Sequence, residues 1–351
     1  MLITPQGLNV FFTALETRFW SAYDLAPLFY PKVATTYPVG SEIWLSGWLN
    51  MVDKMREWVG PRIVRTPAPQ TYQVPVKPFE LTEEIDRFKI ADDMHGIYYP
   101  AVDFMGMQAK KAPDYQFRDL IQNTAGSSWT GNFQLGTDQL THWNTAHPVD
   151  VYDASKGTYP NDYSGGGISI NGVTVGGGLA ANSFATVWED MARRKSESGE
   201  AQRVRGALLF AGVMLKATAM FILEAQFLGL PVIGNLGTGN LSATGSPANA
   251  NQAMVGSSDN MFRNWSDLAI WEDLGGSATL GNGTMDSGWY LVDNTKPVMP
   301  FSYLHRMDTE FAFMVEPDNP VVFSTHKYVY GAVNRFAVAW GLPFLSSRSS
   351  P

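Results

Sequence analysis

One stretch of the chain cannot be stabilised by its own residues. Residues 46–87 form a largely polar segment that is typical of a long hairpin, without an apolar face wide enough to hold it against a core. Tyr72, Val74 and Val76 alternate with polar residues and prolines, which is the two-residue period of a strand. Pro75 confines that strand to an edge or a protruding ribbon. Because an isolated two-stranded hairpin is marginal in water, this arm needs a surface outside its own subunit, and we expect the chain to be part of an assembly.

The composition is globular, with little charge. Of 351 residues, 45% are hydrophobic and 17% charged, which argues against disorder and suggests that much of the surface ends up covered. The net charge of −8 argues against a nucleic-acid reader, which presents a basic face. The absence of cysteine excludes disulfides, thiolate zinc sites and cysteine nucleophiles. Neither a signal peptide nor an apolar run of about 18 residues is visible, so no membrane span is expected.

Two long helices are expected near the N-terminus. Residues 5–22 carry a wide aromatic stripe that includes Phe11 and Phe12, and this stripe could bury on its own subunit or on a neighbour. Residues 23–45 contain three prolines and are expected to be an extended tether. A second helical run falls within 95–124, where Pro113 should introduce a kink or start a new helix. Its roughly 25 residues would span roughly 35–40 Å, which is long for a compact domain.

The remainder of the chain mixes shorter elements with loops. A helix is expected around 184–191, and residues 213–228 are apolar nearly all round, which predicts a central buried helix. Residues 231–288 are rich in Gly, Asn, Ser and Ala and are expected to form surface loops. A short β-ribbon is expected at 165–178, and strands are expected at 204–210, 268–271, 289–293, 312–315, 321–333 and 336–340.

No catalytic constellation is apparent. His142 and His147 lie near Asp138 and Asp150, which could be a metal-ligand cluster, but the spacing matches no named zinc pattern and a structural loop is favoured. The basic run 193–195 sits where a helix should end, so complementing the helix dipole is its expected role. The glycine-rich segment 234–246 lacks the Gly-Lys-Ser/Thr of a phosphate-binding loop.

A set of short segments along the chain carries a resemblance to a known family: Met1–Pro5, Tyr30, Val33–Thr35, Gly47–Leu49, Met55–Gly60, Phe79–Thr82, Asp86-Arg87, Ile90, Asp92-Asp93, Gly96–Tyr98, Met105-Gly106, Pro113-Asp114, Trp289–Leu291, Lys296–Val298 and Tyr328–Gly331. These segments resemble the Mu-like major head subunit (gpT) family, and the order of the expected elements resembles the major capsid proteins of tailed phages with the Hong Kong 97 fold. The similarity is dense over 1–120, fair near the C-terminus and weak over 150–290. One departure lies at 144–148, which reads Asn-Thr-Ala-His-Pro where the family often shows Asp-Thr-Asp-His-Pro, and it weakens any metal or catalytic role there.

The resemblance implies an α+β, Hong Kong 97-type capsid fold. The implied parts are an N-terminal arm at 1–45, an extended E-loop at 46–80, a peripheral (P) domain at 81–150 and 300–351 with its spine helix within 95–124, and an axial (A) domain at 151–299 with Gly/Asn-rich loops. Because the chain starts at Met1, no cleaved N-terminal scaffolding segment is expected. Some phages with this fold cross-link Lys to Asn; Lys54 lies in the implied E-loop, but the sequence identifies no partner for it.

The implied function is structural, with no enzymatic activity, catalytic residue, cofactor or metal. Many copies, arranged as hexamers and pentamers, would form an icosahedral shell around packaged double-stranded DNA, which they would contact non-specifically. Portal and scaffold proteins would be partners, a decoration protein is left open, and no membrane is involved. The protein would reside in the virion after assembly in the host bacterial cytoplasm.

The residues expected at inter-subunit contacts are large apolar or basic side chains of the arm and hairpin. Trp48 and Trp58 should anchor the hairpin across a subunit boundary, so replacing both with alanine should leave a soluble monomer that forms no shells. The full predicted contact set is Phe11, Phe12, Trp48, Arg56, Trp58, Arg62, Tyr72 and Phe79.

Two other classes stay open at this point. A secreted carbohydrate-binding or glycosidase-like protein would account for the eleven tryptophans, but it would need an export signal and paired carboxylates in one cleft. Another virion component, such as a tail-sheath or scaffold protein, is the second alternative. Negative-stain microscopy would separate the three classes as shells, filaments or unassembled protein.

Overall fold

The computed structural model has two compact units, and each mixes helices with β-sheet. Unit 1 comprises Met1–Leu45, Gln73–Ile121 and Ser302–Ala339, and unit 2 comprises Ser46–Tyr72, Gln122–Phe301 and Trp340–Pro351. The structure describes residues 5–49, 69–92, 96–122, 138, 140–164, 168–170, 173–175, 178–229, 257–275, 288–316 and 319–350.

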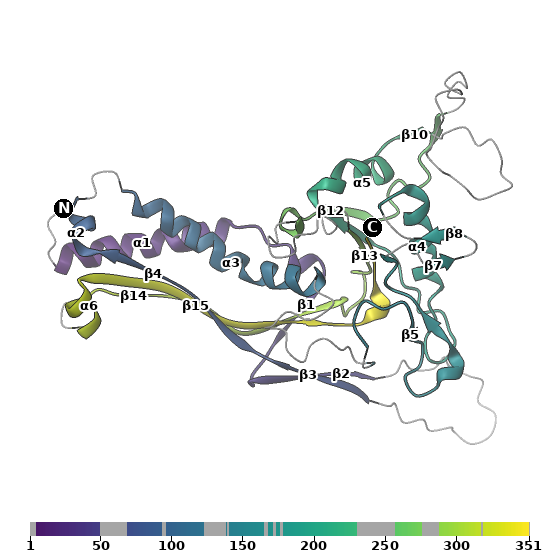
Figure 1. The fold of residues 1–351 in the computed structure, drawn as a ribbon, viewed down its shortest axis with the longest axis horizontal. Helices are drawn as coiled ribbons and strands as arrows, with labels where there is room; N and C mark the ends of the chain where they lie inside the picture. Colours follow the sequence, from purple (N-terminus) through teal and green to yellow (C-terminus); the bar gives the residue numbers. More distant parts are fainter. Residues whose placement is uncertain are drawn as a thin grey trace. The chain divides into compact units, whose positions relative to one another are not determined.

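Unit 1 is a four-stranded sheet accompanied by two long helices (Figure 1). The strand order is β1-β14-β15-β4, and β15 pairs antiparallel with β4 from Lys327↔Asp86 to Phe336↔Lys77. Its elements are α1 (Pro5–Leu25), η1 (Tyr30–Lys32), β1 (Ala34–Pro38), β4 (Lys77–Asp86), α2 (Arg87–Asp92), α3 (Tyr98–Gln122), β14 (Phe301–Met314), α6 (Pro320–Thr325) and β15 (Lys327–Trp340).

The aromatic stripe of α1 forms the core of unit 1. Phe12 is fully buried; its ring stacks on Phe313 at 5.4 Å between centroids and meets Tyr328 edge-on at 5.9 Å. Leu15 and Phe19, one and two turns further along, are also fully buried. The predicted helix is confirmed, and of the two alternatives left open for its stripe, burial on its own subunit is the one that the structure shows.

Helices α1 and α3 are held closely together. A Cβ added at Gly106 of α3 would lie 2.5 Å from the carbonyl oxygen of Phe19, so only glycine permits this approach of the two backbones. Beside it, the Arg18 guanidinium bonds to the Asp103 carboxylate, with Nε 3.0 Å from Oδ1. Helix α3 continues through Pro113 for 25 residues, so the expected start of a second helix at this proline is wrong, and the alternative, a kink, stays a prediction.

A single buried carboxylate fixes the segment that follows α1. Asp114 is 1% exposed and accepts hydrogen bonds from the backbone amides of Phe29 and Tyr30, both at 2.8 Å. The Tyr30 ring also stacks on Phe117 at 5.7 Å. The expected extended tether is therefore partly wrong, because 23–45 contains a 3₁₀ turn anchored on α3 and a strand, β1, beside β14.

Unit 2 is built around a second four-stranded sheet with the order β12-β9-β13-β16. Strands β12 and β9 are parallel, and the other pairings are antiparallel. The elements of unit 2 are β5 (His147–Pro148), η3 (Ala154–Lys156), β6 (Thr158–Tyr159), β7 (Ile168–Ile170), β8 (Val173–Val175), α4 (Ala181–Arg193), β9 (Leu208–Ala211), η5 (Val213–Leu215), α5 (Lys216–Leu223), β10 (Phe227–Gly229), β11 (Ser257–Asp259), β12 (Asp267–Ile270), η7 (Glu272–Gly275), β13 (Trp289–Val292), η9 (Pro343–Leu345) and β16 (Ser346–Ser349).

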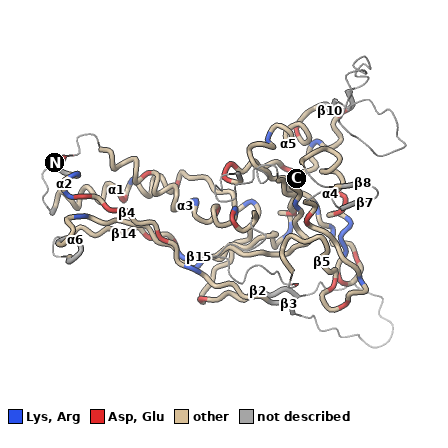
Figure 2. The backbone as a smooth tube through the Cα atoms, viewed as in Figure 1, with Lys and Arg blue, Asp and Glu red and all other residues tan. Residues whose placement is uncertain are grey.

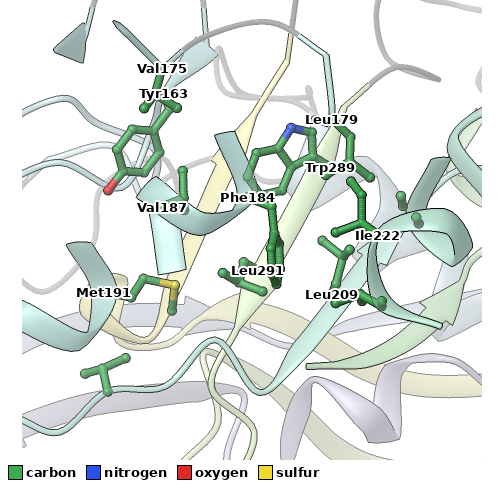
Figure 3. Packing of buried hydrophobic residues seen from close by; sticks show 14 of the residues in the cluster. Tyr163, Val175, Leu179, Phe184, Val187, Met191, Leu209, Ile222, Trp289 and Leu291 are labelled. Atoms are coloured by element: carbon green, nitrogen blue, oxygen red, sulfur yellow. The ribbon is translucent and has the colours of Figure 1, made fainter. Parts of the chain in front are cut away.

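The apolar core of unit 2 lies between this sheet and helices α4 and α5. Figure 3 shows Phe184 of α4 among Trp289, Leu291 and Leu209 of the sheet, with Ile222 of α5 at the edge of the group. All five are 2% exposed or less. The expected helix near 184–191 and the strands near 268–271 and 289–293 are confirmed, as is the ribbon expected at 165–178, whose described strands β7 and β8 pair with each other.

Three other expectations are confirmed only in part. In unit 1, the expected strand at 321–333 is helix α6 up to Thr325 and strand β15 from Lys327 onward; α6 has Pro320 at its first position, where a missing amide hydrogen costs nothing. The expected strand at 204–210 is confined to β9. The expected buried helix at 213–228 is the shorter α5, and it exposes Met220 and Phe221.

A buried guanidinium ties the C-terminal segment to unit 2. Arg194 follows α4 directly, and its side chain is 1% exposed. It donates to the carbonyl oxygens of Phe344 at 2.6 Å and Pro160 at 2.9 Å, and to the Ser347 hydroxyl at 2.6 Å. The basic run at the end of α4 therefore does more than complement the helix dipole, since its middle residue positions η9 and β16.

Candidate assembly surface

A two-stranded hairpin carries apolar side chains on its outer surface. Strands β2 (Ile43–Leu49) and β3 (Pro69–Pro75) pair with each other, and the Val76 amide donates to the Glu42 carbonyl at 2.8 Å near the base. Ile43 is 52% exposed and Leu45 is 59% exposed. Between them in sequence, the Trp44 ring contacts Tyr37 at 5.4 Å. The hairpin is thus fixed at its base and presents two aliphatic residues to solvent.

Four of the predicted contact residues have described surroundings within this chain. Phe11 and Phe12 lie in the core of unit 1, at 5% and 0% exposure. Tyr72 is 9% exposed and donates its hydroxyl to the Trp340 carbonyl, both in unit 2. Phe79 is half-buried, with its ring stacked on Phe336 at 4.5 Å. These four side chains therefore pack against their own chain.

The other four predicted residues belong to the hairpin and its tip. Trp48 lies in β2, at the expected place in the hairpin. Arg56, Trp58 and Arg62 lie outside the described residues, as does Lys54. Inter-subunit contacts stay a prediction for all eight residues of the predicted set.

The structure reveals exposed apolar residues that the sequence reasoning missed. Ile43 and Leu45 precede the residues from which the hairpin was inferred. Phe104 of α3 is 62% exposed, and Val10 of α1 is 68% exposed. A signal for Phe104 was present, because its position falls outside the buried stripe formed by Val102, Met105 and Ala109.

The histidine cluster forms a hydrogen-bonded loop. His147 is fully buried; its Nδ1 lies 2.5 Å from Asp138, and its Nε2 donates to the His142 carbonyl at 2.9 Å. Burial lowers the pKa of His142 well below its usual value, and the neighbouring His147 and Arg348 lower it further, so this imidazole is neutral. Asp150 pairs with Lys156 at 2.7 Å. His147, Asp138 and Asp150 are thus engaged in bonds that shape the loop, and the His142 Nε2 lies 2.9 Å from the Ser346 hydroxyl, which supports the structural interpretation.

The described residues contain neither a candidate metal site nor a membrane-spanning helix. No group of three or more His, Cys, Asp or Glu residues among them could hold a metal ion. Within the same residues, no helix has the length and apolar character needed to cross a membrane.

Acidic residues gather on one strand of unit 1. Glu80, Glu83 and Glu84 of β4 are all exposed, and Figure 2 shows β4 marked by acidic positions. Lys327 of β15 pairs with Glu84, and the Tyr330 hydroxyl donates to Glu83 at 2.7 Å. Since only one of the three carboxylates has a cationic partner among these contacts, this edge of the sheet is negatively charged.

Comparison with known proteins connects this architecture to phage heads. The Mu-like prophage major head subunit gpT family matches residues 8–171 and 267–350. The major capsid protein of Escherichia phage Mu is 29% identical over 171 residues, which cover 49% of this chain and 50% of that protein. The Mu-like prophage FluMu major head subunit of Haemophilus influenzae is 26% identical over 148 residues, covering 42% and 46%. The chain therefore spans about half the length of the curated relatives that it matches.

Solved capsid structures of low sequence identity show the same fold. The procapsid protein of bacteriophage JBD30 is 22% identical with a TM-score of 0.50, covering 99% of this chain and 76% of that chain. The capsid of the cyanophage P-SCSP1u, at 9% identity, gives a TM-score of 0.52 and covers 92% and 88%. These likenesses show a Hong Kong 97-type capsid fold. Since the family match extends over well more than half of the sequence, the chain belongs to the Mu-like prophage major head subunit gpT family.

Proposed function

We propose that this chain is the structural major head subunit of a tailed phage, and that many copies assemble into an icosahedral shell around the double-stranded DNA genome. The observation that carries the proposal is the family match at both ends of a chain with a capsid fold. The expected role is mechanical, without a catalytic step or a cofactor.

Within such a shell, the hairpin is proposed to be the E-loop of residues 46–80, extended toward a neighbouring subunit. Support comes from Ile43 and Leu45, which are more than half exposed at its base. Burying such a side chain contributes about 1.5–3 kcal/mol, and a shell repeats the contact in every copy. The other proposed parts are the arm at 1–45, the spine helix α3, the P domain at 81–150 and 300–351, and the A domain at 151–299.

The charge of the protein suits a container for DNA. A net charge of −8 and the acidic edge of β4 disfavour tight, salt-sensitive binding to phosphates, so packaged DNA would be contacted only weakly and non-specifically. Portal and scaffold proteins are the proposed partners. Hexamers and pentamers of this chain would form the shell in the host bacterial cytoplasm and remain in the virion.

The test is to express the protein, separate assembled from unassembled protein by sedimentation, and image both by negative-stain microscopy. Closed shells are the expected result. Filaments would point to a sheath-like component instead, and protein that stays unassembled at all concentrations would contradict the proposal.

One substitution tests the hairpin separately from the fold. Leu45→Asp places a charge on the exposed face of β2 and should abolish shells while the thermal unfolding of the unassembled subunit stays unchanged. Gln73→Asp, at an exposed position of β3, is the matched control and should assemble like the parent. Normal assembly of Leu45→Asp would remove the hairpin from the proposed interface.

A further inference from the structure

His142 is a histidine enclosed by aromatic rings in unit 2. It is 2% exposed, and its ring stacks on the Trp340 ring at 4.2 Å between centroids. The Trp143 ring meets it edge-on at 4.7 Å, and the Phe301 ring lies 5.6 Å away. Burial among such apolar groups disfavours the charged form of an imidazole.

The polar atoms of His142 join segments that are far apart in sequence. Its Nε2 lies 2.9 Å from the Ser346 hydroxyl of β16. Its carbonyl oxygen accepts hydrogen bonds from the Asn161 side chain at 2.6 Å and from the His147 Nε2 at 2.9 Å. The residue therefore ties the loop of residues 140–148 to the C-terminal segment 340–350.

The second ring nitrogen of His142 has no acceptor to donate to. Nδ1 is buried and makes no hydrogen bond within the part of the chain that the structure describes. The neutral ring needs only one acceptor, because only one of its two nitrogens carries a hydrogen. A protonated ring has two N–H donors, so protonation would bury one unsatisfied donor together with a positive charge, and both are costly.

The charges around His142 also oppose its protonation. Burial lowers its pKa, and His147 of the same loop and Arg348 of β16 lower it further. Each of these two neighbours holds a carboxylate of its own, since Asp138 bonds to His147 and Asp162 bonds to Arg348. The contacts from β14 and β15 are aromatic rings, so no carboxylate in the described structure is bonded to the His142 ring.

We propose that His142 is an acid-sensitive latch, and that its protonation releases the C-terminal segment 340–350 from the loop of residues 140–148. An imidazole in an open, solvated chain has a pKa of about 6.5. Since the pKa in the closed state is lower, the open state binds more protons, and the latch weakens as the pH falls below about 6.5. In the proposed shell every copy would respond to the same change of pH. The inference concerns the single subunit, so its failure would leave the proposed function untouched.

Hydrogen exchange of the unassembled subunit tests the latch locally. The Arg348 amide, which donates to the Asn161 carbonyl at 2.8 Å, reports on the C-terminal segment. After correction for the intrinsic rate, it should exchange at least about tenfold faster at pH 5 than at pH 7.5, while the amides of α1 in unit 1 should change less than about twofold. An equal response in the two places, or no response at Arg348, would overturn the inference.

A substitution shows whether His142 is the group that responds. His142→Gln removes the titratable ring and keeps an amide that can reach the Ser346 hydroxyl, so exchange at Arg348 should change less than about twofold between the two pH values. The matched control is His305→Gln, at a partly exposed histidine beside Asp308 in β14, and it should keep the full response of the parent. A full response in His142→Gln would assign it to another group and overturn the inference.

NMR of the parent protein gives the answer even if His142→Gln does not fold. The His142 ring is identified by its contacts with the Trp340 ring, and its signals should remain those of a neutral imidazole from pH 7.5 down to pH 6. A His142 ring that titrated in the folded subunit with the ordinary histidine pKa of about 6.5 would overturn the inference.

Discussion

The two units of this chain use different kinds of core. Unit 1 is centred on the rings of α1 packed against β14 and β15, with Phe12, Leu15 and Phe19 fully buried one turn apart. Unit 2 has an apolar core of similar kind, but beside it lies a set of buried polar groups that includes Arg194 and Asn161. The first core depends on volume and shape, and the second depends also on hydrogen bonds between segments far apart in sequence.

The substitution with the largest expected effect on stability is Arg194→Met in unit 2. The variant removes a buried guanidinium and leaves the carbonyl groups of Pro160, Phe344 and Ser346 without their donor. Loss of such a group costs about 3–5 kcal/mol, which we expect as the fall in the free energy of unfolding of the unassembled subunit. The control is Arg193→Met, whose side chain is 60% exposed and which should change stability by less than about 0.5 kcal/mol. Equal effects at the two positions would show that burial of Arg194 contributes nothing.

The corresponding test in unit 1 is Leu15→Ala. Leu15 is 0% exposed, so the substitution leaves a cavity and should lower the free energy of unfolding by about 2–4 kcal/mol in denaturant titrations. Val10→Ala, on the exposed side of the same helix at 68% exposure, should be nearly neutral. A similar loss at both positions would show that the burial of Leu15 contributes no more to stability than the exposed Val10 does.

The same contrast explains what the sequence could predict. Helix α1 was predictable because its buried residues recur every three or four positions, which is a local pattern. The continuation of α3 through Pro113 was not predictable from the sequence, because it depends on the buried neighbours Ala109 and Phe117, which hold the helix on both sides of the proline. The role of Arg194 was equally hidden, since Pro160 and Phe344 are 34 and 150 residues away.

The candidate assembly surface was also predictable from the sequence only in part. The hairpin followed from the alternation around Val74 and from its lack of an apolar face. The exposure of Leu45 did not follow from the sequence, because an aliphatic residue in a strand is usually a core residue. Only the packed structure shows which way its side chain faces. Met220 and Phe221 of α5 were expected to be core for the same reason, because a helix that is apolar all round predicts burial and does not show which of its sides the core reaches.

A smaller effect is expected at the buried carboxylate of unit 1, which is an exception to its apolar character. Asp114→Asn keeps one acceptor for the Phe29 and Tyr30 amides but removes the charge that strengthens both bonds. The free energy of unfolding should fall by about 1.5–3 kcal/mol. Asp119→Asn, on a partly exposed residue of the same helix, is the control and should cost less than about 0.5 kcal/mol. If the two variants were equally stable, the 3₁₀ turn would not depend on Asp114.

The smallest expected effect is a pH dependence of the free energy of unfolding, and it arises from a buried carboxylate of unit 2. Burial raises the pKa of Asp162 in unit 2, but the hydrogen bond and charge of Arg348, 2.6 Å away, together with the hydrogen bonds from Ser164, lower it by more, so the pKa lies below its ordinary value. Folding therefore gains stability from this carboxylate above its unfolded pKa of about 3.9, and loses it as the pH falls through the lower folded pKa. Asp162→Asn should be less stable than the parent by about 1 kcal/mol at pH 7, and the difference should shrink once the pH falls below about 4. Denaturant titrations of both proteins from pH 7 to pH 3 measure it, and a difference that stayed constant across that range would show that Asp162 contributes through its shape and not through its charge.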